Sequence, residues 1–202
     1  MINQLKSSNK IHNRILFETE DFLVTSALGG FEIGWVLVWP KRSAMSFFDL
    51  EEGGFPHKSV LKNIFSPEVA ETAIWFEHGS RVRGQSIGCG VDYAHIHVLV
   101  APSFDLETMK GQVIKETNDR WINTDSVYNY KNIGNGYHIF GQGQKSLMAF
   151  NTTDLGSQFF RRIIAGIKGN KNTWNYKKYP FKNICASTVN FIEQHENKIF
   201  RL

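Results

Sequence analysis

Short apolar runs joined by short connections fill the first half of this chain, and they constrain its fold more than any other feature. The runs are rich in the β-branched and aromatic side chains that favour strands. They comprise residues 15–18, 22–26, 34–39, 71–80 and 90–102. Antiparallel neighbours tolerate short connections, whereas parallel neighbours need long crossovers. The pattern therefore predicts an antiparallel sheet over residues 15–102.

The second half of the chain has a different pattern. Leu106, Met109 and Val113 recur at helical spacing, and residues 157–169 and 181–200 also carry apolar residues spaced as on a helix face. Residues 136–150 predict a hairpin around a Gly-rich turn. Together the two halves predict an α+β fold. At 202 residues the chain fits one structural domain.

Within that domain we expect three segments. Residues 1–14 are polar and predicted to be disordered or frayed, and residues 15–102 form the sheet core. Residues 103–202 are expected to be a C-terminal extension packed on that core. No Pro-rich linker or internal repeat indicates a second independent domain.

The fifth run, "GVDYAHIHVLVAP", carries two imidazoles. Because side chains alternate faces along a strand, Tyr93, His95 and His97 are expected on one side, with the two histidines about 6–7 Å apart along the strand. Ala94 and Ile96 are expected on the other side, facing the core. The spacing suits two histidines that act on one small anionic group.

Three interpretations of the histidine pair stay open on spacing alone. Histidines satisfied by backbone carbonyls or solvent are the plainest. Metal ligation is the second, with His78 or Glu77 from the preceding strand as a further ligand. In the third, a neutral imidazole attacks phosphorus to form a phosphohistidine, and the second imidazole stabilises the charge on the phosphoryl oxygens.

Composition narrows the class of protein. The chain is 42% hydrophobic and 13% aromatic, which allows a sizeable core. Its net charge of +4 suits an anionic ligand but is weak for a dedicated nucleic-acid binder, so nucleic acid is an unlikely partner. Two distant cysteines and no eighteen-residue apolar stretch indicate a protein of the cytoplasm that does not span a membrane.

At a helix start, Gln158 and Arg161 are candidates for binding a polyphosphate.

Several motifs resemble those of the histidine-triad (HIT) superfamily. They are "ETEDFLVTSA", "GWVLVWPKRSAMSFFDL" and "YAHIHVLVAP", together with "FEHGS" and "SQFFRR", which are similar to elements of a bacterial branch of these proteins. The resemblance covers residues 15–102 well and residues 155–185 more loosely.

The resemblance implies a five-stranded antiparallel sheet, pairing into a homodimer, and a nucleotide or dinucleoside polyphosphate substrate, with no cofactor or metal. The activity that it implies is that of a nucleotide phosphohydrolase or nucleotidyl transferase, which cleaves a nucleotide phosphoanhydride or phosphoramidate through a covalent nucleotidyl-histidine. Carried over by position, the nucleophile falls on His95 and a phosphate contact on His97. Further phosphate-side or loop positions fall on Cys89, Gly90 and Glu77. The nucleoside is expected against the first strands, near Phe22, Val24, Ser26 and Trp35.

Two departures from the family pattern affect the expected chemistry. Tyr93 stands at the first triad histidine, and Trp35 follows Gly34 where a histidine is frequent. A phenol, with a pKa of about 10, protonates a leaving group less readily than an imidazolium. His78 is a candidate to compensate. The alternative functions are a nucleotide-binding protein with little turnover and, less favoured, a metal-dependent enzyme using His78, His95 and His97.

Overall fold

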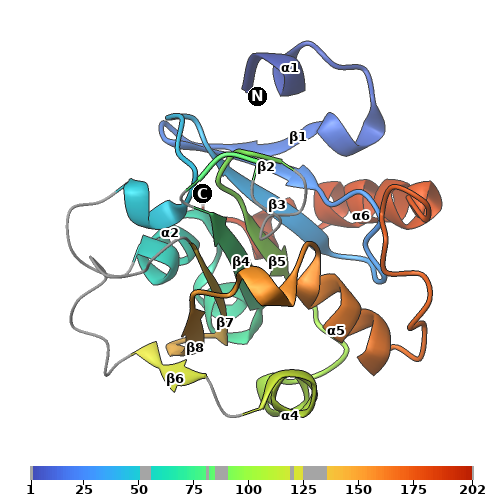
Figure 1. The fold of residues 1–202 in the computed structure, drawn as a ribbon. Helices are drawn as coiled ribbons and strands as arrows, with labels where there is room; N and C mark the ends of the chain where they lie inside the picture. The colour runs from blue at the N-terminus through green and yellow to red at the C-terminus, as the bar shows by residue number, and fades with distance from the viewer. Residues whose placement is uncertain are drawn as a thin grey trace.

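One eight-stranded antiparallel sheet organises the computed structural model, which describes residues 2–50, 56–80, 82–84, 91–118, 121–124 and 136–201 (Figure 1). The strand bounds are Ile15–Glu18 (β1), Phe22–Ser26 (β2), Trp35–Pro40 (β3), Ile74–Ser80 (β4), Ile96–Leu99 (β5), Ile122–Asn123 (β6), Gly136–Gln142 (β7) and Lys145–Phe150 (β8). Their order in the sheet is β1-β2-β3-β5-β4-β7-β8-β6. The α+β class is confirmed.

The predicted five-stranded sheet is wrong. Five strands from residues 15–102 are contiguous, but β7, β8 and β6 from the second half extend the same sheet beyond β4. β7 pairs with β4 at seven positions, from Ile74–Gln142 to Ser80–Gly136. Every residue of β4 is buried, so an unpaired β4 edge would leave its backbone N–H and C=O groups without partners. The C-terminal half therefore completes the sheet instead of only packing on it.

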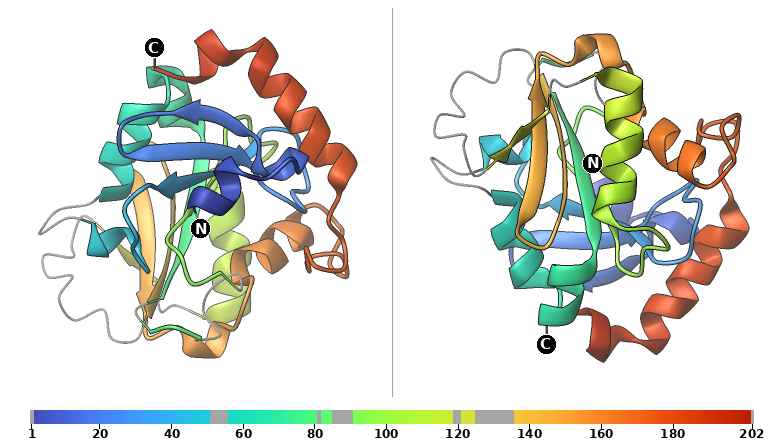
Figure 2. Two further views of the ribbon diagram at one scale, coloured as in Figure 1. Left: turned by 90° about the horizontal axis from the view of Figure 1, so that it is seen from above. Right: turned by 90° about the horizontal axis from the view of Figure 1, so that it is seen from below.

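Helices cover both faces of the sheet. On one face, Val60 of α2 and Val189 of α6 join the core formed by Val36, Val38 and Val98. On the other face lie α4 and α5 (Figure 2). Met109 of α4 and Ile163 of α5 pack there against five buried residues of the strands. These are Trp35, Ile74, Phe76, Leu99 and Phe140. Two separate apolar cores thus sandwich the strands that carry the histidines.

The helices described are seven α-helices and three 3-10 turns. They are α1 (Ile2–Lys6), η1 (Ile11–Asn13), η2 (Phe47–Asp49), α2 (Pro56–Ile64), α3 (Pro67–Thr72), α4 (Leu106–Thr117), η5 (Thr153–Leu155), α5 (Phe159–Ile167), α6 (Lys182–Gln194) and α7 (Glu196–Ile199). Among these described helices, none has both the length and the apolar character that a membrane span requires.

The first residues, expected to be frayed, contain α1 and η1, which lie beside β1 and β2 (Figure 1). A helix as short as α1 is not stable by itself in water. Leu5 is buried against Leu23 and Trp39, and this contact supplies the tertiary stabilisation that the polar sequence around it does not suggest. Lys6 also forms an ion pair with Glu18 on β1.

Candidate active site

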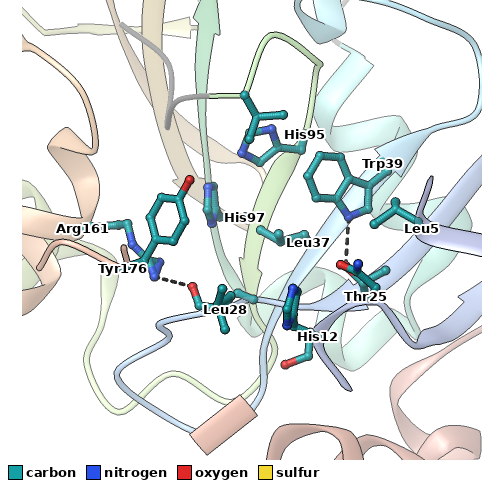
Figure 3. A pocket seen from close by; sticks show the side chains of 14 residues that line it. Leu5, His12, Thr25, Leu28, Leu37, Trp39, His95, His97, Arg161 and Tyr176 are labelled. Carbon is teal, nitrogen blue, oxygen red and sulfur yellow. Dashed lines mark hydrogen bonds between the residues drawn. The ribbon is translucent and has the colours of Figure 1, made fainter. Parts of the chain in front are cut away.

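A cavity of about 200 Å³ opens on the face of β2, β3 and β5 that carries the histidine pair. The N-terminal segment forms one wall, and α5 with the loop after it forms another. In Figure 3, Arg161 and Tyr176 stand on one side, and Trp39 and Leu5 on the opposite side. The lining residues are Leu5, His12, Asn13, Thr25, Ser26, Ala27, Leu28, Leu37, Trp39, Val91, His95, His97, Arg161 and Tyr176.

His95 is held in one tautomer. Its Nδ1 lies 2.9 Å from the carbonyl oxygen of Tyr93. A carbonyl only accepts hydrogen bonds, so the neutral ring carries its proton on Nδ1 and a lone pair on Nε2. Burial lowers the pKa of His95 against smaller opposing effects from the Tyr93 carbonyl and Glu77, and the Arg161 cation adds a lesser lowering effect. At neutral pH the ring is therefore an uncharged imidazole with a basic Nε2.

His97 has the opposite tautomer. The indole N–H of Trp35 donates to Nδ1 of His97 over 3.1 Å, so the proton of the neutral ring is on Nε2. Phe76 stacks on the imidazole with centroids 4.5 Å apart and an interplanar angle of 11°. Burial holds the pKa of His97 well below its ordinary value, and the neighbouring His95 and His78 act in the same direction. The rings of His95 and His97 lie 4.9 Å apart, on one face as the alternation predicts.

Arg161 brings a positive charge to the same cavity. The residue is only 1% exposed, and its guanidinium donates to the carbonyl oxygen of Leu28 over 2.7 Å. The guanidinium also lies 4.9 Å from the ring centroid of Trp35 and 5.4 Å from that of Tyr176. Aromatic faces stabilise a desolvated cation, and a guanidinium suits phosphate geometry. The predicted phosphate-binding role of Arg161 is thus compatible with its position.

Two predicted contact residues support other side chains instead of lining the cavity. Trp35 is fully buried, and its indole fixes the tautomer of His97. Gln158, the residue before α5, accepts a hydrogen bond from the backbone N–H of Tyr176 with its side-chain oxygen. Its φ of +59° places it in the left-handed region, which non-glycine residues adopt at a cost.

Glu77 lies on the opposite face of the sheet from the cavity. Neighbouring residues of a strand point to opposite sides, so the inward direction of Phe76 and His78 turns Glu77 away. Its carboxylate accepts from the backbone N–H of Phe47, pairs with His57 at 2.5 Å and accepts from the hydroxyl of Tyr137. The structure therefore assigns Glu77 to a buried polar network and not to the substrate site.

The predicted nucleoside contacts on β2 are partly wrong, because Phe22 and Val24 face away from the cavity and Thr25 faces it. Phe22 and Val24 pack in the core on the far face, where Phe22 stacks on Phe47 with centroids 6.1 Å apart. Thr25, between Val24 and Ser26, faces the cavity and accepts from the indole N–H of Trp39. Ser26 does line the cavity, and its hydroxyl donates to the carbonyl oxygen of Cys185.

Tyr93 does not present its hydroxyl to the cavity. The phenol donates to the carbonyl oxygen of Pro40 over 2.9 Å, with the carbonyls of Lys41 and Arg42 at 3.3 Å. Burial raises its pKa, which makes it a weaker acid. Position 93 lies outside β5 and further from its start than His95, and its side chain does not follow the alternation that places His95 and His97 on one face. The predicted residues Cys89 and Gly90 lie outside the described part of the chain.

His78 lies deeper than the cavity. It accepts from the backbone N–H of Phe160 with Nε2 and meets the rings of His97 and His138 edge-on, at 6.0 and 4.8 Å. Burial holds its pKa well below the ordinary value. Within the described residues, no group of three His, Cys, Asp or Glu side chains is placed to hold a metal ion. The geometry thus gives the metal interpretation of His78, His95 and His97 no support.

The cavity also has lining residues that the sequence analysis did not name. They are Leu5, His12, Asn13, Thr25, Ala27, Leu28, Leu37, Trp39, Val91 and Tyr176. Aromatic and lysine residues are mixed around Tyr176, but this composition does not predict a particular site. No pattern in the neighbouring sequence indicates that Tyr176 lies near the histidines. A scan against protein-family models finds no match for the chain, and a search of curated proteins finds none either.

Proposed function

We propose that this protein is a nucleotide phosphohydrolase or nucleotidyl transferase that forms a covalent nucleotidyl-histidine on His95. The proposal also takes from the HIT resemblance a nucleotide or dinucleoside polyphosphate substrate, a homodimer, a cytoplasmic setting and chemistry without a cofactor. The observation that carries it is the tautomer of His95, whose Nδ1–H is engaged by the Tyr93 carbonyl in a ring that lines a cavity. That arrangement prepares Nε2 as a nucleophile.

In the proposed reaction, Nε2 of His95 attacks the α-phosphorus of the nucleotide. The new N–P bond forms as the bond from phosphorus to the leaving atom breaks, and the leaving atom takes the bonding electron pair. Water or another acceptor then attacks phosphorus and releases its proton to the solvent, and the N–P bond breaks to restore the lone pair on Nε2. The single displacement is thereby divided into two easier ones.

The neighbouring groups suit the charge that develops in these steps. His97 offers an N–H on Nε2, because Trp35 occupies its Nδ1, and Arg161 contributes a permanent positive charge. Fixed donors aimed at phosphoryl oxygens in a dry site stabilise the transition state without reorganisation. The apolar walls at Leu5, Leu37 and Trp39 suit the uncharged nucleoside end of the substrate.

Intact-mass measurement tests the proposal. The purified chain is mixed briefly with a panel of nucleoside 5′-polyphosphates, dinucleoside polyphosphates and nucleoside 5′-phosphoramidates, and then quenched in base, where a P–N bond survives. We expect a mass gain of one nucleoside monophosphate less water, lost on acid treatment and absent in His95→Ala. His12→Ala, which changes a histidine on the far wall, should retain the adduct.

The same experiment distinguishes an enzyme from a nucleotide-binding protein with little turnover. Nucleotide binding by calorimetry without any adduct across the panel, and with no turnover, would reject the enzyme and leave a nucleotide-binding protein. An adduct that persists in His95→Ala would reject the assigned nucleophile.

A further inference from the structure

The proposed chemistry needs a proton donor for poor leaving groups, and Tyr93 is turned away from the cavity by its hydrogen bond to Pro40. We propose that Tyr176 is the catalytic acid of this site, and that it protonates the group that leaves the α-phosphorus. This inference rests on the proposed function of His95.

The position of Tyr176 supports this role. Its side chain lines the same cavity as His95, His97 and Arg161. In Figure 3 the hydroxyl oxygen of Tyr176 points toward the end of the cavity where the two histidines lie. A leaving group expelled in line from the α-phosphorus departs on the side opposite Nε2 of His95, so an acid must come from a different segment than the one that carries His95. Tyr176 comes from the loop between α5 and α6.

The surroundings fix Tyr176 closely. Its backbone N–H donates to the side chain of Gln158, which adopts a left-handed φ of +59°. Its Cβ packs so tightly on Gly29 that a Cβ added there would lie only 2.5 Å from it, and Gly29 itself has φ +72°. The left-handed backbone is costly at Gln158 and is available to Gly29 because it has no Cβ. Both positions contact the one tyrosine, which is the pattern expected where a side chain must be placed accurately.

The chemistry is consistent with a phenol. As the bond from phosphorus to the leaving atom breaks, the leaving atom takes the electron pair together with the hydroxyl proton of Tyr176. The resulting phenolate lies beside the Arg161 guanidinium, 5.4 Å from the ring centroid, which stabilises its charge. When water attacks the nucleotidyl-histidine, its proton returns to the phenolate instead of to the solvent. An acid with an ordinary pKa of about 10 matches alcohols and amines, whereas a polyphosphate needs little proton assistance.

A leaving-group series tests the inference. The nucleoside that gives the adduct on His95 is used as its 5′-phosphate joined to p-nitrophenol, to phenol and to an aliphatic alcohol, and as its 5′-phosphoramidate of an aliphatic amine. For Tyr176→Phe we expect the rate to fall by about 10²-fold or more with the alkyl ester and the amidate, and to change little with the p-nitrophenyl ester. The phenyl ring keeps the contacts with Arg161 and Gly29, so the variant should fold.

Tyr179→Phe is the matched control, since Tyr179 belongs to the same loop but is 40% exposed and stacks on Phe181. It should keep wild-type rates with every substrate. An equal loss by Tyr176→Phe across the whole series would overturn the inference and leave Tyr176 as a binding residue only. Failure of the wild-type chain to form an adduct with the p-nitrophenyl ester would instead reject the proposed function and this inference with it.

Discussion

The indole N–H of Trp35 and the Nδ1 atom of His97 lie 3.1 Å apart, in a hydrogen bond between neighbouring strands β3 and β5. Both groups are buried, so neither finds a replacement partner in water. This one bond decides which nitrogen of His97 carries the proton. In the proposed reaction, that N–H is the group offered to a phosphoryl oxygen.

We therefore expect Trp35→Phe to release the His97 tautomer. The ring should populate the Nδ1–H form, visible in ¹⁵N NMR, and adduct formation should slow by about 10²-fold, the effect of losing one fixed donor. Loss of the indole should also destabilise the fold by about 1–3 kcal/mol. Trp75→Phe, which shortens a buried indole on the opposite face, is the control and should lower stability without slowing the reaction. An unchanged His97 tautomer in Trp35→Phe would contradict the assignment.

Glu77 provides a second prediction, which separates a structural from a substrate-binding role. The carboxylate is 1% exposed and pairs with His57, which is fully buried. Gln in place of Glu77 puts an amide where the carboxylate takes part in three buried hydrogen bonds. Each buried group left without a matching partner costs about 1–3 kcal/mol, so Glu77→Gln should lower the urea midpoint strongly at an unchanged m-value. Tyr137→Phe, which removes one hydrogen bond to the same carboxylate, should cost about 1–3 kcal/mol. Nucleotide affinity should be equal in both variants and wild type; weakened binding with intact stability would return Glu77 to the substrate site.

Buried histidines predict the pH dependence of stability. Burial lowers the pKa values of His78, His95 and His97 in the folded protein. Below pH about 6.5 the unfolded chain therefore binds more protons than the folded one. The contribution of these three histidines to the free energy of unfolding is therefore complete above about pH 6.5 and is lost as the pH falls below that value. Each group contributes a slope of about 1.4 kcal/mol per pH unit in that range.

Urea unfolding measured from about pH 7.5 to about pH 5 checks this slope. His78→Gln should make the slope shallower by the share of one histidine, whatever its effect on stability at neutral pH. A free energy of unfolding that stays constant across the range would show that the three rings are protonated alike in both states.

The sequence predicted well those features that depend on the residues of a single strand. The bounds of β1 and β2 match the prediction residue for residue, and His95 and His97 share a face as alternation requires. The choice of face in β2 failed because both faces of the sheet are covered. Leu23, Val24, Thr25 and Ser26 are all buried, so the apolar pattern does not distinguish the cavity side from the other.

Contacts between segments that are far apart in the sequence could not be predicted, because the patterns used describe only neighbouring residues. The eight-stranded sheet depends on pairing of β4 with β7, where Glu77 lies opposite Ile139. The site likewise gains Tyr176 only because the loop after α5 packs on Gly29. Tyr93 was predicted to face the site because regular alternation was extended past the start of β5, where the chain is no longer a strand.

Arg161 and Arg162 are neighbours on α5 and provide a matched pair for the last prediction. Arg161 lines the cavity, whereas the Arg162 guanidinium donates to the carbonyl oxygens of Ser157 and Leu155 and lies beside Trp174, away from the histidines. Each arginine loses its charge but keeps much of its volume when replaced by methionine, so a difference between the two variants reports the local role of the cation.

For Arg161→Met we expect nucleotide affinity to fall by about 10- to 10²-fold, because hydrogen bonds to charged groups contribute about 1.5–3 kcal/mol. The pKa of His95 should rise, since the Arg161 cation lowers it in the wild-type protein. Adduct formation should then fail at a higher pH on the acid side, because a protonated His95 is no nucleophile. Arg162→Met should alter neither quantity. Calorimetry and an NMR titration of His95 measure both, and equal effects of the two substitutions would show that Arg161 acts through the fold instead of through the substrate.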